Sequence, residues 1–179
     1  MNKILIVIDA QNDFISGALG NPACEPVVEY IVKKVKEYHD NEEKVIFTYD
    51  THDETYLDTL EGKKLPVPHC IYRTEGWRID QRIRNEMNDW EDIDVHKKTF
   101  GYIGWKPFYS GVIKEDTVIE LVGFDSDICV VSNGLILRAS FPNNRIIVDA
   151  KGCWGTTKEK HNAALDVMES CQIEVINRN

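Results

Sequence analysis

Short runs of apolar, β-branched residues alternate with segments of helical periodicity along the chain. The runs predict six strands, over residues Lys3–Ile8, Lys44–Tyr49, Ile93–His96, Thr117–Val122, Arg145–Val148 and Ile173–Ile176. Apolar residues recur at helical spacing between them, which predicts helices around residues 27–35, 79–90, 127–140 and 157–171. Strands that alternate with helices form βαβ units. We therefore expect a single α/β domain over residues 1–179, with a mostly parallel sheet covered by helices on both faces.

Two segments interrupt this alternation. Residues Thr51–Trp77 are polar and punctuated by Gly and Pro, whereas Lys97–Ser110 are rich in aromatic residues and Gly. Loops this long inside a compact domain are usually functional or disordered, and their aromatic content argues against disorder.

Two other conspicuous residues have structural explanations. His161 is expected to be solvated on a charged helix, and Trp90 is expected to pack against its neighbours.

Composition narrows the class of partner. The chain of 179 residues carries 21 Lys and Arg against 30 Asp and Glu, a formal net charge of −9. Neutralisation of phosphates supplies most non-specific affinity for nucleic acid, so this balance argues against a nucleic-acid partner and against an anionic membrane surface. The apolar run at Ile4–Ile8 is too short for a signal peptide or a membrane span. Five cysteines without a CxxC pair argue against a disulfide framework and indicate a reduced, cytoplasmic location.

Chemistry-bearing residues follow several of the expected strands. In open parallel sheets, ligands bind at the carboxyl ends of the strands. Those ends place Asp9, Asp50, the pair Lys97 and Lys98, and the segment 125–129 along one edge. A single Asp at a strand end is most often a helix cap or a turn residue, but the convergence of several such groups favours a site.

Cys129 is the most informative of these residues. It follows a strand-to-helix turn, so we expect it in the first turn of a helix, where free N–H groups and the helix dipole favour a thiolate. The same N–H groups can hold an oxyanion. Asp9 and Lys97 at neighbouring strand ends would supply a general acid/base and a cation. The alternative interpretation of Cys129 is a small buried residue of the core.

A second constellation has the composition of a metal site. Asp50 and His52 leave a strand end, and Glu61 and His69 follow in the same loop. Carboxylate and imidazole ligands suit Zn²⁺, Mn²⁺ or Fe²⁺. The segment Pro66–Pro68 stiffens the approach to the last histidine. On spacing alone this is a weak signal, because two histidines and assorted acids also occur together by chance.

Three short motifs, in order along nearly the whole chain, resemble those of the isochorismatase-like cysteine hydrolases and, within them, of the nicotinamidase branch. Residues 7–14, VIDAQNDF, resemble the opening D-x-Q-x-D-F motif of the family. Residues 95–101, VHKKTFG, resemble its lysine segment, and residues 122–130, VGFDSDICV, its G-x-x-x-D-x-C-V nucleophile turn.

The resemblance implies a fold and a catalytic apparatus. The fold would be a doubly wound, six-stranded parallel sheet in the order 3-2-1-4-5-6. The catalytic residues would be Asp9, Lys97 and Cys129, with Lys98 as the alternative lysine. The backbone N–H groups of Asp125 and Cys129 would form the oxyanion hole, after a cis peptide bond that precedes Asp125.

The resemblance also implies a divalent metal, zinc in the first place and manganese or iron as alternatives. Its ligands would be Asp50, His52, Glu61 and His69. Phe14 would contact the substrate ring. Nicotinamidases usually carry an aromatic residue immediately before the proline pair, where this chain has Leu65. Trp77, Tyr102 or Trp105 would then supply the second ring face.

The activity implied is that of a cysteine-dependent amidohydrolase, which releases ammonia from nicotinamide through a thioester and whose ring-binding metal anchors the substrate. Its partners would be a small-molecule amide and further copies of itself in a homo-oligomer. Hydrolysis of another amide or carbamoyl compound is an alternative, and so is a catalytically silent, metal-binding homologue. A dinucleotide-binding oxidoreductase is excluded, because residues 9–12 stand where G-x-G-x-x-G would follow the first strand.

Overall fold

The computed structural model describes residues 2–178 and contains a six-stranded, all-parallel sheet in the order β3-β2-β1-β4-β5-β6, which confirms the expected topology. The strands are β1 (Lys3–Ile8), β2 (Lys44–Asp50), β3 (Ile93–Lys97), β4 (Val118–Gly123), β5 (Ile146–Cys153) and β6 (Glu174–Ile176). Most bounds lie within one residue of those expected from the sequence. The exception is β5, which continues to Cys153 instead of ending at Val148.

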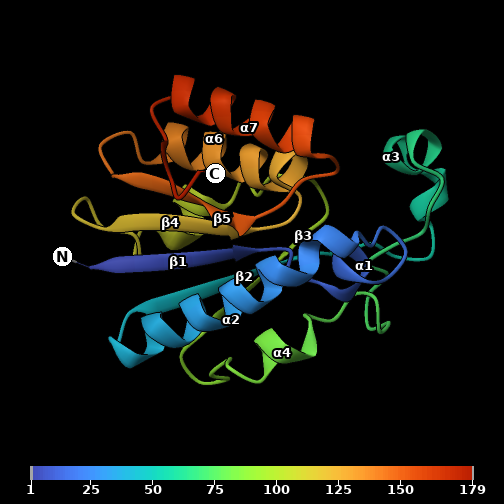
Figure 1. The fold of residues 1–179 in the computed structure, drawn as a ribbon, viewed down its shortest axis with the longest axis horizontal. Coiled ribbons are helices and arrows are strands. Elements are labelled where there is room, and N and C mark those ends of the chain that lie inside the picture. The colour runs from blue at the N-terminus through green and yellow to red at the C-terminus, as the bar shows by residue number, and fades with distance from the viewer. Residues whose placement is uncertain (1, 179) are drawn as a thin grey trace.

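Helices cover both faces of the sheet, as expected. In Figure 1, α2 (Glu25–Asp40) and α4 (Gln81–Arg84) lie on one face, and α6 (Val131–Ser140) and α7 (Lys158–Ser170) on the other. The remaining elements are α1 (Asn12–Ile15), α3 (Leu60–Lys64), α5 (Trp105–Tyr109), 3-10 turns at Pro22–Cys24 and Tyr56–Asp58, and a π-helical turn at Ser126–Val130. No helix within residues 2–178 combines the length and apolar character that a membrane crossing requires.

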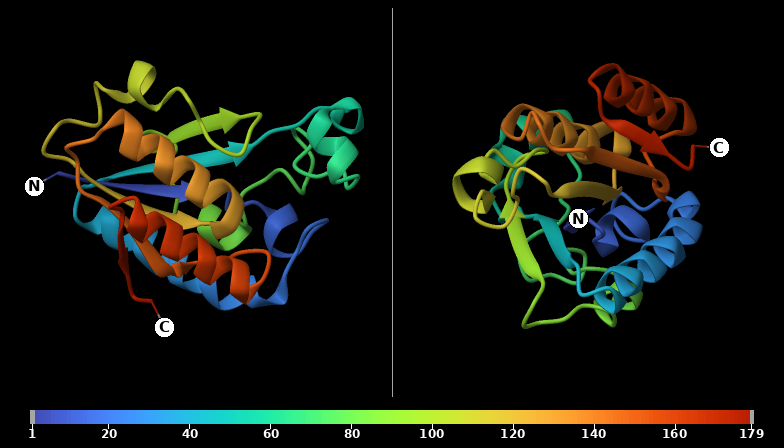
Figure 2. Two further views of the ribbon diagram at one scale, coloured as in Figure 1. Left: turned by 90° about the horizontal axis from the view of Figure 1, so that it is seen from above. Right: turned by 90° about the vertical axis from the view of Figure 1, so that its left-hand side faces the viewer.

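The two faces of the central strand β1 contribute side chains to two separate hydrophobic clusters. Ile4 and Ile6 pack with residues of α6 and α7, whereas Leu5 and Val7 pack with residues of α2. Strands buried on both faces read as continuous apolar runs, which is why the pattern in the sequence located them well. The views of Figure 2 show the two helical layers on either side of the sheet.

The segment after α4 differs from the expected helix over residues 79–90, because only Gln81–Arg84 is α-helical. Side chains compete with the helix for backbone N–H groups just beyond it. Asp92 accepts from the N–H of Asn88 at 2.8 Å, and the Asn88 side chain accepts from the N–H of Trp90 at 3.2 Å. Trp90 is 95% exposed, so the expectation that it packs against its neighbours is wrong.

His161 is buried, and the expectation that it is solvated is wrong. Its Nδ1 lies 2.9 Å from Oγ of Ser126, and its ring stacks on Trp154 with centroids 5.3 Å apart. His161 shares the buried face of α7 with Ala164 and Leu165, three and four residues further on. The position of His161 on the apolar face of the helix therefore decides its burial, and its charged neighbours in the sequence do not.

Gly123, at the end of β4, allows this strand to approach β1 just before Asp9. Its φ of +126° disfavours any other residue, and a Cβ there would lie 2.0 Å from the carbonyl oxygen of Ile8. We expect Gly123→Ala to lower the free energy of unfolding by about 3 kcal/mol or more, because strained backbone and a backbone clash add. Urea denaturation measures this. Gly111→Ala is the matched control, since no atom lies within 4 Å of its added Cβ; an equal loss in both variants would contradict the assignment.

Candidate active site

The carboxyl ends of the strands meet at the edge of the sheet where α1 and α3 lie (Figure 1). A cavity of about 460 Å³ opens at this edge. Its lining includes Phe14, Asp50, Glu61, His69, Asp125 and Cys129. Residues that are far apart in the sequence therefore meet in one place, as in other open parallel sheets.

Lys97, the last residue of β3, contacts both Asp9 and Cys129. Its Nζ lies 2.6 Å from Oδ2 of Asp9 and 3.7 Å from Sγ of Cys129. All three side chains are almost fully buried, with residue exposures of 0% for Asp9 and 3% for the other two. The structure thus brings the base, the cation and the thiol of the sequence analysis together.

The alternative lysine lies elsewhere. The Lys98 side chain is 76% exposed and its Nζ is 3.5 Å from Asp53 on the surface. Side chains alternate along a strand, so Lys97 shares the buried side with Val95 while its neighbours point away. The geometry therefore favours Lys97 over Lys98 as the partner of Asp9.

Asp9 stands just after β1 in a left-handed conformation with a φ of 46°. Thr48 of β2 fixes it twice: its Oγ1 accepts from the Asp9 N–H at 3.1 Å and donates to Oδ1 at 2.6 Å. One carboxylate oxygen is thereby bound to Thr48 and the other to Lys97. Sequence reasoning missed Thr48, although its position two residues before Asp50 in β2 places it opposite the end of β1.

Cys129 lies in the π-helical turn Ser126–Val130, which leads into α6. The peptide bond between Phe124 and Asp125 is cis, as the resemblance implied. The carbonyl oxygen of Asp125 accepts from the N–H groups of Ile128 at 3.1 Å and Val130 at 3.0 Å. Within residues 2–178, no backbone acceptor takes the N–H of Asp125 itself. Asp125 lines the same cavity as Cys129, so its N–H is a candidate donor for the oxyanion hole.

Burial and charge set the protonation of this group. Burial raises the pKa of Cys129 well above its ordinary value, and the Lys97 ammonium opposes this only in part. Burial also raises the pKa of Asp9, again against the effect of Lys97. Burial disfavours the charge on Lys97, but Asp9, Cys129 and Asp50 outweigh it and raise the Lys97 pKa. These shifts favour a protonated thiol beside a charged Lys97 ammonium, which contacts the Asp9 carboxyl group at 2.6 Å.

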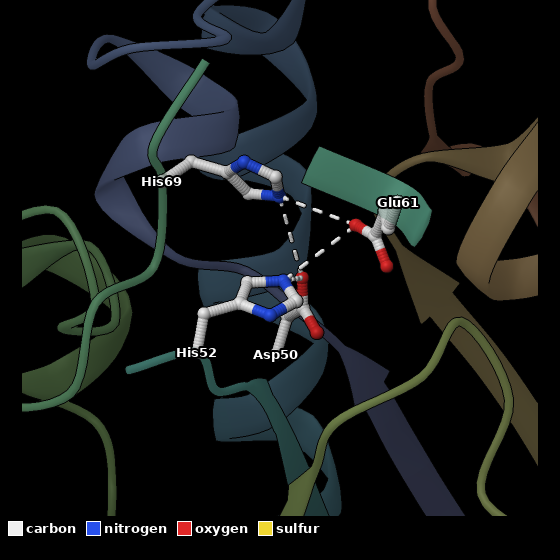
Figure 3. Close-up of side chains that lie close together, drawn as sticks. All are labelled: Asp50, His52, Glu61 and His69. Carbon is white, nitrogen blue, oxygen red and sulfur yellow. Dashed lines mark hydrogen bonds and ion pairs between the residues drawn. The ribbon is translucent and has the colours of Figure 1, made fainter. Parts of the chain in front are cut away.

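Next to this group lies the cluster shown in Figure 3. One ligand atom from each of four side chains lies within 4.8 Å of the others, and the residues are Asp50, His52, Glu61 and His69. Nε2 of His52 is 3.0 Å from Oδ2 of Asp50 and 3.6 Å from Oε1 of Glu61. Nε2 of His69 is 3.6 Å from the same oxygen of Asp50 and 3.9 Å from that of Glu61.

The donor chemistry of this cluster fits a divalent ion. Nδ1 of His69 lies 2.8 Å from the carbonyl oxygen of Val67. A carbonyl can only accept, so Nδ1 carries the proton and Nε2 presents a lone pair to the cluster. Two imidazoles with two carboxylates form a mixed set that Zn²⁺, Mn²⁺ and Fe²⁺ accept.

Asp50 connects the cluster to the cysteine site. Its Oδ1 lies 3.6 Å from Nζ of Lys97, while Oδ2 faces the two histidines. Gln11 holds the Asp50 backbone at both ends: its Nε2 donates to the carbonyl oxygen at 2.9 Å, and its Oε1 accepts from the N–H at 2.7 Å. Sequence reasoning gave Gln11 no role, although it is the glutamine of the opening motif.

The aromatic part of the cavity differs from expectation. Phe14 lines it and packs edge-on against His69, with centroids 5.8 Å apart. Trp77 instead lines a different hollow with Tyr49, so the structure does not bring it into this cavity. Tyr102 packs edge-on against the fully buried Trp105 of the core, and neither ring lines this cavity.

The exposed ring in the cavity that sequence reasoning missed is Phe100, which is 44% exposed. It belongs to the aromatic segment Lys97–Ser110 after β3, whose length and composition indicate a functional loop. The conformation of the loop determines which of its rings lines the cavity. Hydrophobic periodicity carries no information about that conformation.

Comparison with known proteins identifies the family and the fold. The family model described as the isochorismatase domain matches residues 3–179. No curated protein matches the chain at a significant level. Among solved structures, a nicotinamidase/pyrazinamidase, PncA from Bacillus subtilis, is 26% identical with a TM-score of 0.83, over 98% of this chain and 99% of that chain.

Two further structures share the fold at lower identity. A pyrazinamidase of Pyrococcus horikoshii in complex with zinc is 18% identical with a TM-score of 0.81, over 99% of this chain and 100% of that chain. An N-carbamoylsarcosine amidase from Thermoplasma acidophilum is 22% identical with a TM-score of 0.76, over 98% and 95% of the two chains. With the family model over almost its whole length, the chain belongs to the isochorismatase family of hydrolases.

Proposed function

We propose that this protein is a cysteine-dependent amidohydrolase that releases ammonia from a small planar amide, with nicotinamide as the first candidate substrate. The observation that carries the proposal is Lys97, whose ammonium bridges the Asp9 carboxylate and the Cys129 thiol beside a cavity of about 460 Å³. A cavity of this size suits a small molecule. The nicotinamidase/pyrazinamidase that resembles this chain over its whole length supports the substrate class.

The first half of the reaction forms a thioester. Asp9 takes the proton of Cys129, and the thiolate attacks the amide carbon, so that a C–S bond forms as the carbonyl becomes an oxyanion. The backbone N–H groups of Asp125 and Cys129 hold the oxyanion, where one donor contributes roughly 3–4 kcal/mol. Asp9 then returns the proton to the amide nitrogen, the C–N bond breaks, and ammonia leaves.

The second half hydrolyses the thioester. Asp9, again a carboxylate, takes a proton from water, whose oxygen attacks the thioester carbon. The C–S bond breaks, the carboxylic acid leaves, and the proton returns to the Cys129 sulfur. Lys97 keeps one positive charge in contact with both groups, so each proton transfer occurs within a balanced set of charges.

Asp50, His52, Glu61 and His69 would hold a divalent ion beside the cavity. Such an ion supplies a Lewis acid that anchors and polarises a ligand atom of the substrate. His69 also packs against Phe14. The four candidate ligands therefore lie at the end of the cavity where the Phe14 ring would contact a substrate.

The metal assignment predicts a stability change. After removal of metal with a chelator, Zn²⁺ at about 100 times its Kd is expected to raise the thermal midpoint by roughly 5–10 °C, because an ion that binds only the folded state stabilises it by mass action. Differential scanning calorimetry measures the shift. His69→Ala should remove it and the control His39→Ala, whose imidazole pairs with Asp92, should keep it. The same shift in both variants, or none in the wild type, would contradict the site.

A second candidate is hydrolysis of another amide or a carbamoyl compound. The observation that favours it is Leu65, which lines the cavity where nicotinamidases usually have an aromatic residue. The similarity to an N-carbamoylsarcosine amidase adds support.

Ammonia release decides between these proposals. Purified protein with Zn²⁺ or Mn²⁺ is incubated with nicotinamide, pyrazinamide, benzamide and N-carbamoyl amino acids, and ammonia is quantified against a no-enzyme control. The first proposal expects the highest kcat/KM with the pyridine amides. Preference for a carbamoyl compound supports the second candidate. Turnover of none of them, under conditions where the protein is folded, supports a silent homologue.

A further inference from the structure

Asp125 lines the cavity, and the proposed reaction does not use its carboxyl group. The mechanism requires only its backbone N–H. The residue nevertheless lines the same cavity as Phe14, His69 and Cys129, and its carboxyl lies close enough to His69 for the two charges to interact. Every residue type except proline could supply that N–H, so an acid at this position demands a separate explanation.

The polar residues that follow are all engaged by the protein. Oγ of Ser126 bonds His161. Asp127 accepts from the N–H of Thr156 at 2.8 Å and from its hydroxyl at 2.7 Å. By contrast, the Asp125 carboxyl accepts no hydrogen bond from residues 2–178, and its pKa responds only to burial and to neighbouring charges.

The backbone that carries this carboxyl is fixed on both sides. The N–H of Phe124 donates to the carbonyl oxygen of Ile8 at 2.9 Å, and that of Ser126 donates to the carbonyl oxygen of Trp154 at 2.8 Å. A group fixed in this way discriminates between ligands better than one on a mobile loop. The free carboxyl is therefore presented at a defined place in the cavity.

The surroundings leave this carboxyl short of a hydrogen-bond donor. Burial, with the nearby carboxylates of Asp127 and Asp9, raises the pKa of Asp125 to about 7, and His69 offsets this only in part. Hydrogen bonding to the charged form favours that form. An N–H group of a ligand would donate the hydrogen bond that the Asp125 carboxyl lacks.

We propose that Asp125 is a specificity-determining residue, whose carboxyl accepts a hydrogen bond from an N–H group of the substrate other than the amide that is cleaved. The inference rests on the proposed function and narrows its substrate class to small amides with a second N–H donor, such as amino-substituted aromatic carboxamides. A site built to bond a substrate N–H rejects the analogue that lacks it, because its own polar group is then left unpaired. Amides with an additional carboxylate are disfavoured by like charge.

The test compares matched substrates. Values of kcat/KM are measured for nicotinamide and for its 2-, 4- and 6-amino derivatives, with the wild type, Asp125→Ala and Asp125→Asn. The wild type should prefer at least one amino derivative by about 10-fold or more, the usual effect of a hydrogen bond to a charged group. Asp125→Ala should bring that ratio close to one. Asp125→Asn should keep part of it, since its side-chain oxygen still accepts.

Controls separate this role from a structural one. Asp116→Ala removes an exposed acid in the turn before β4 and should leave the ratio unchanged. A ratio near one in the wild type, or equal losses on all substrates in Asp125→Ala, would overturn the inference. Binding of the same ligands to Cys129→Ala by calorimetry tells the two proposals apart. A selective affinity that depends on Asp125, in a protein that hydrolyses no amide, would refute the proposed function and uphold the role of Asp125.

Discussion

Replacing Cys129 with Ala is expected to lower kcat/KM for amide hydrolysis by at least about 10⁴-fold, because the variant lacks the thiol that forms the covalent intermediate. The thiol is 3% exposed and lies 3.7 Å from the Lys97 ammonium, so its removal deletes the nucleophile and leaves the charged pair in place. The fold should survive, since Ala fills most of the space of Cys. Circular dichroism and the rate of ammonia release measure the two properties.

Cys171 provides the control for this variant. It is an exposed thiol at the end of α7, outside the cavity. Cys171→Ala is expected to keep the wild-type rate. If both variants release ammonia at the wild-type rate, the nucleophile lies elsewhere and the mechanism is wrong.

Replacing Lys97 with Met is expected to reduce both activity and stability. The Lys97 ammonium is the cation beside Asp9, with an Nζ–Oδ2 distance of 2.6 Å, and it also faces Asp50 at 3.6 Å. Without it, two buried carboxylates face one another, and loss of one member of a buried pair commonly costs about 3–5 kcal/mol. The rate should fall by about 10²–10⁴-fold, the range for loss of acid–base assistance. Denaturant titration and ammonia release measure both effects.

Lys98→Met distinguishes the two adjacent lysines. Its side chain is 76% exposed and pairs with Asp53 at 3.5 Å. Such a surface pair contributes at most about 1 kcal/mol, so activity and stability should remain close to the wild type. The reverse pattern, with Lys98→Met inactive and Lys97→Met active, would contradict the assignment of Lys97.

The parts of the site that the sequence predicted well are those that parallel strands position. Asp9, Asp50 and Lys97 stand at strand ends, and a sheet of known order brings such ends together. The choice between Lys97 and Lys98 is also contained in the sequence. Alternation from Val95 places Lys97, and not Lys98, on the buried side of β3.

The parts that the sequence did not predict depend on loop conformation or on competing side chains. Phe100 lines the cavity in place of Trp77 and Tyr102, because the loops that carry these rings are not constrained by periodicity. Trp90 is exposed because the side chains of Asn88 and Asp92 accept hydrogen bonds from backbone N–H groups that a continuing helix would have needed.

The mechanism requires a single acyl intermediate on Cys129 on the path to the acid. The partition of that intermediate between water and hydroxylamine shows whether it forms. The best amide substrate of the panel and the methyl ester of the same acid are each incubated with enzyme at one fixed hydroxylamine concentration. A common thioester predicts the same ratio of hydroxamate to acid from both compounds, and neither product above background with Cys129→Ala. A ratio that changes with the leaving group would contradict it.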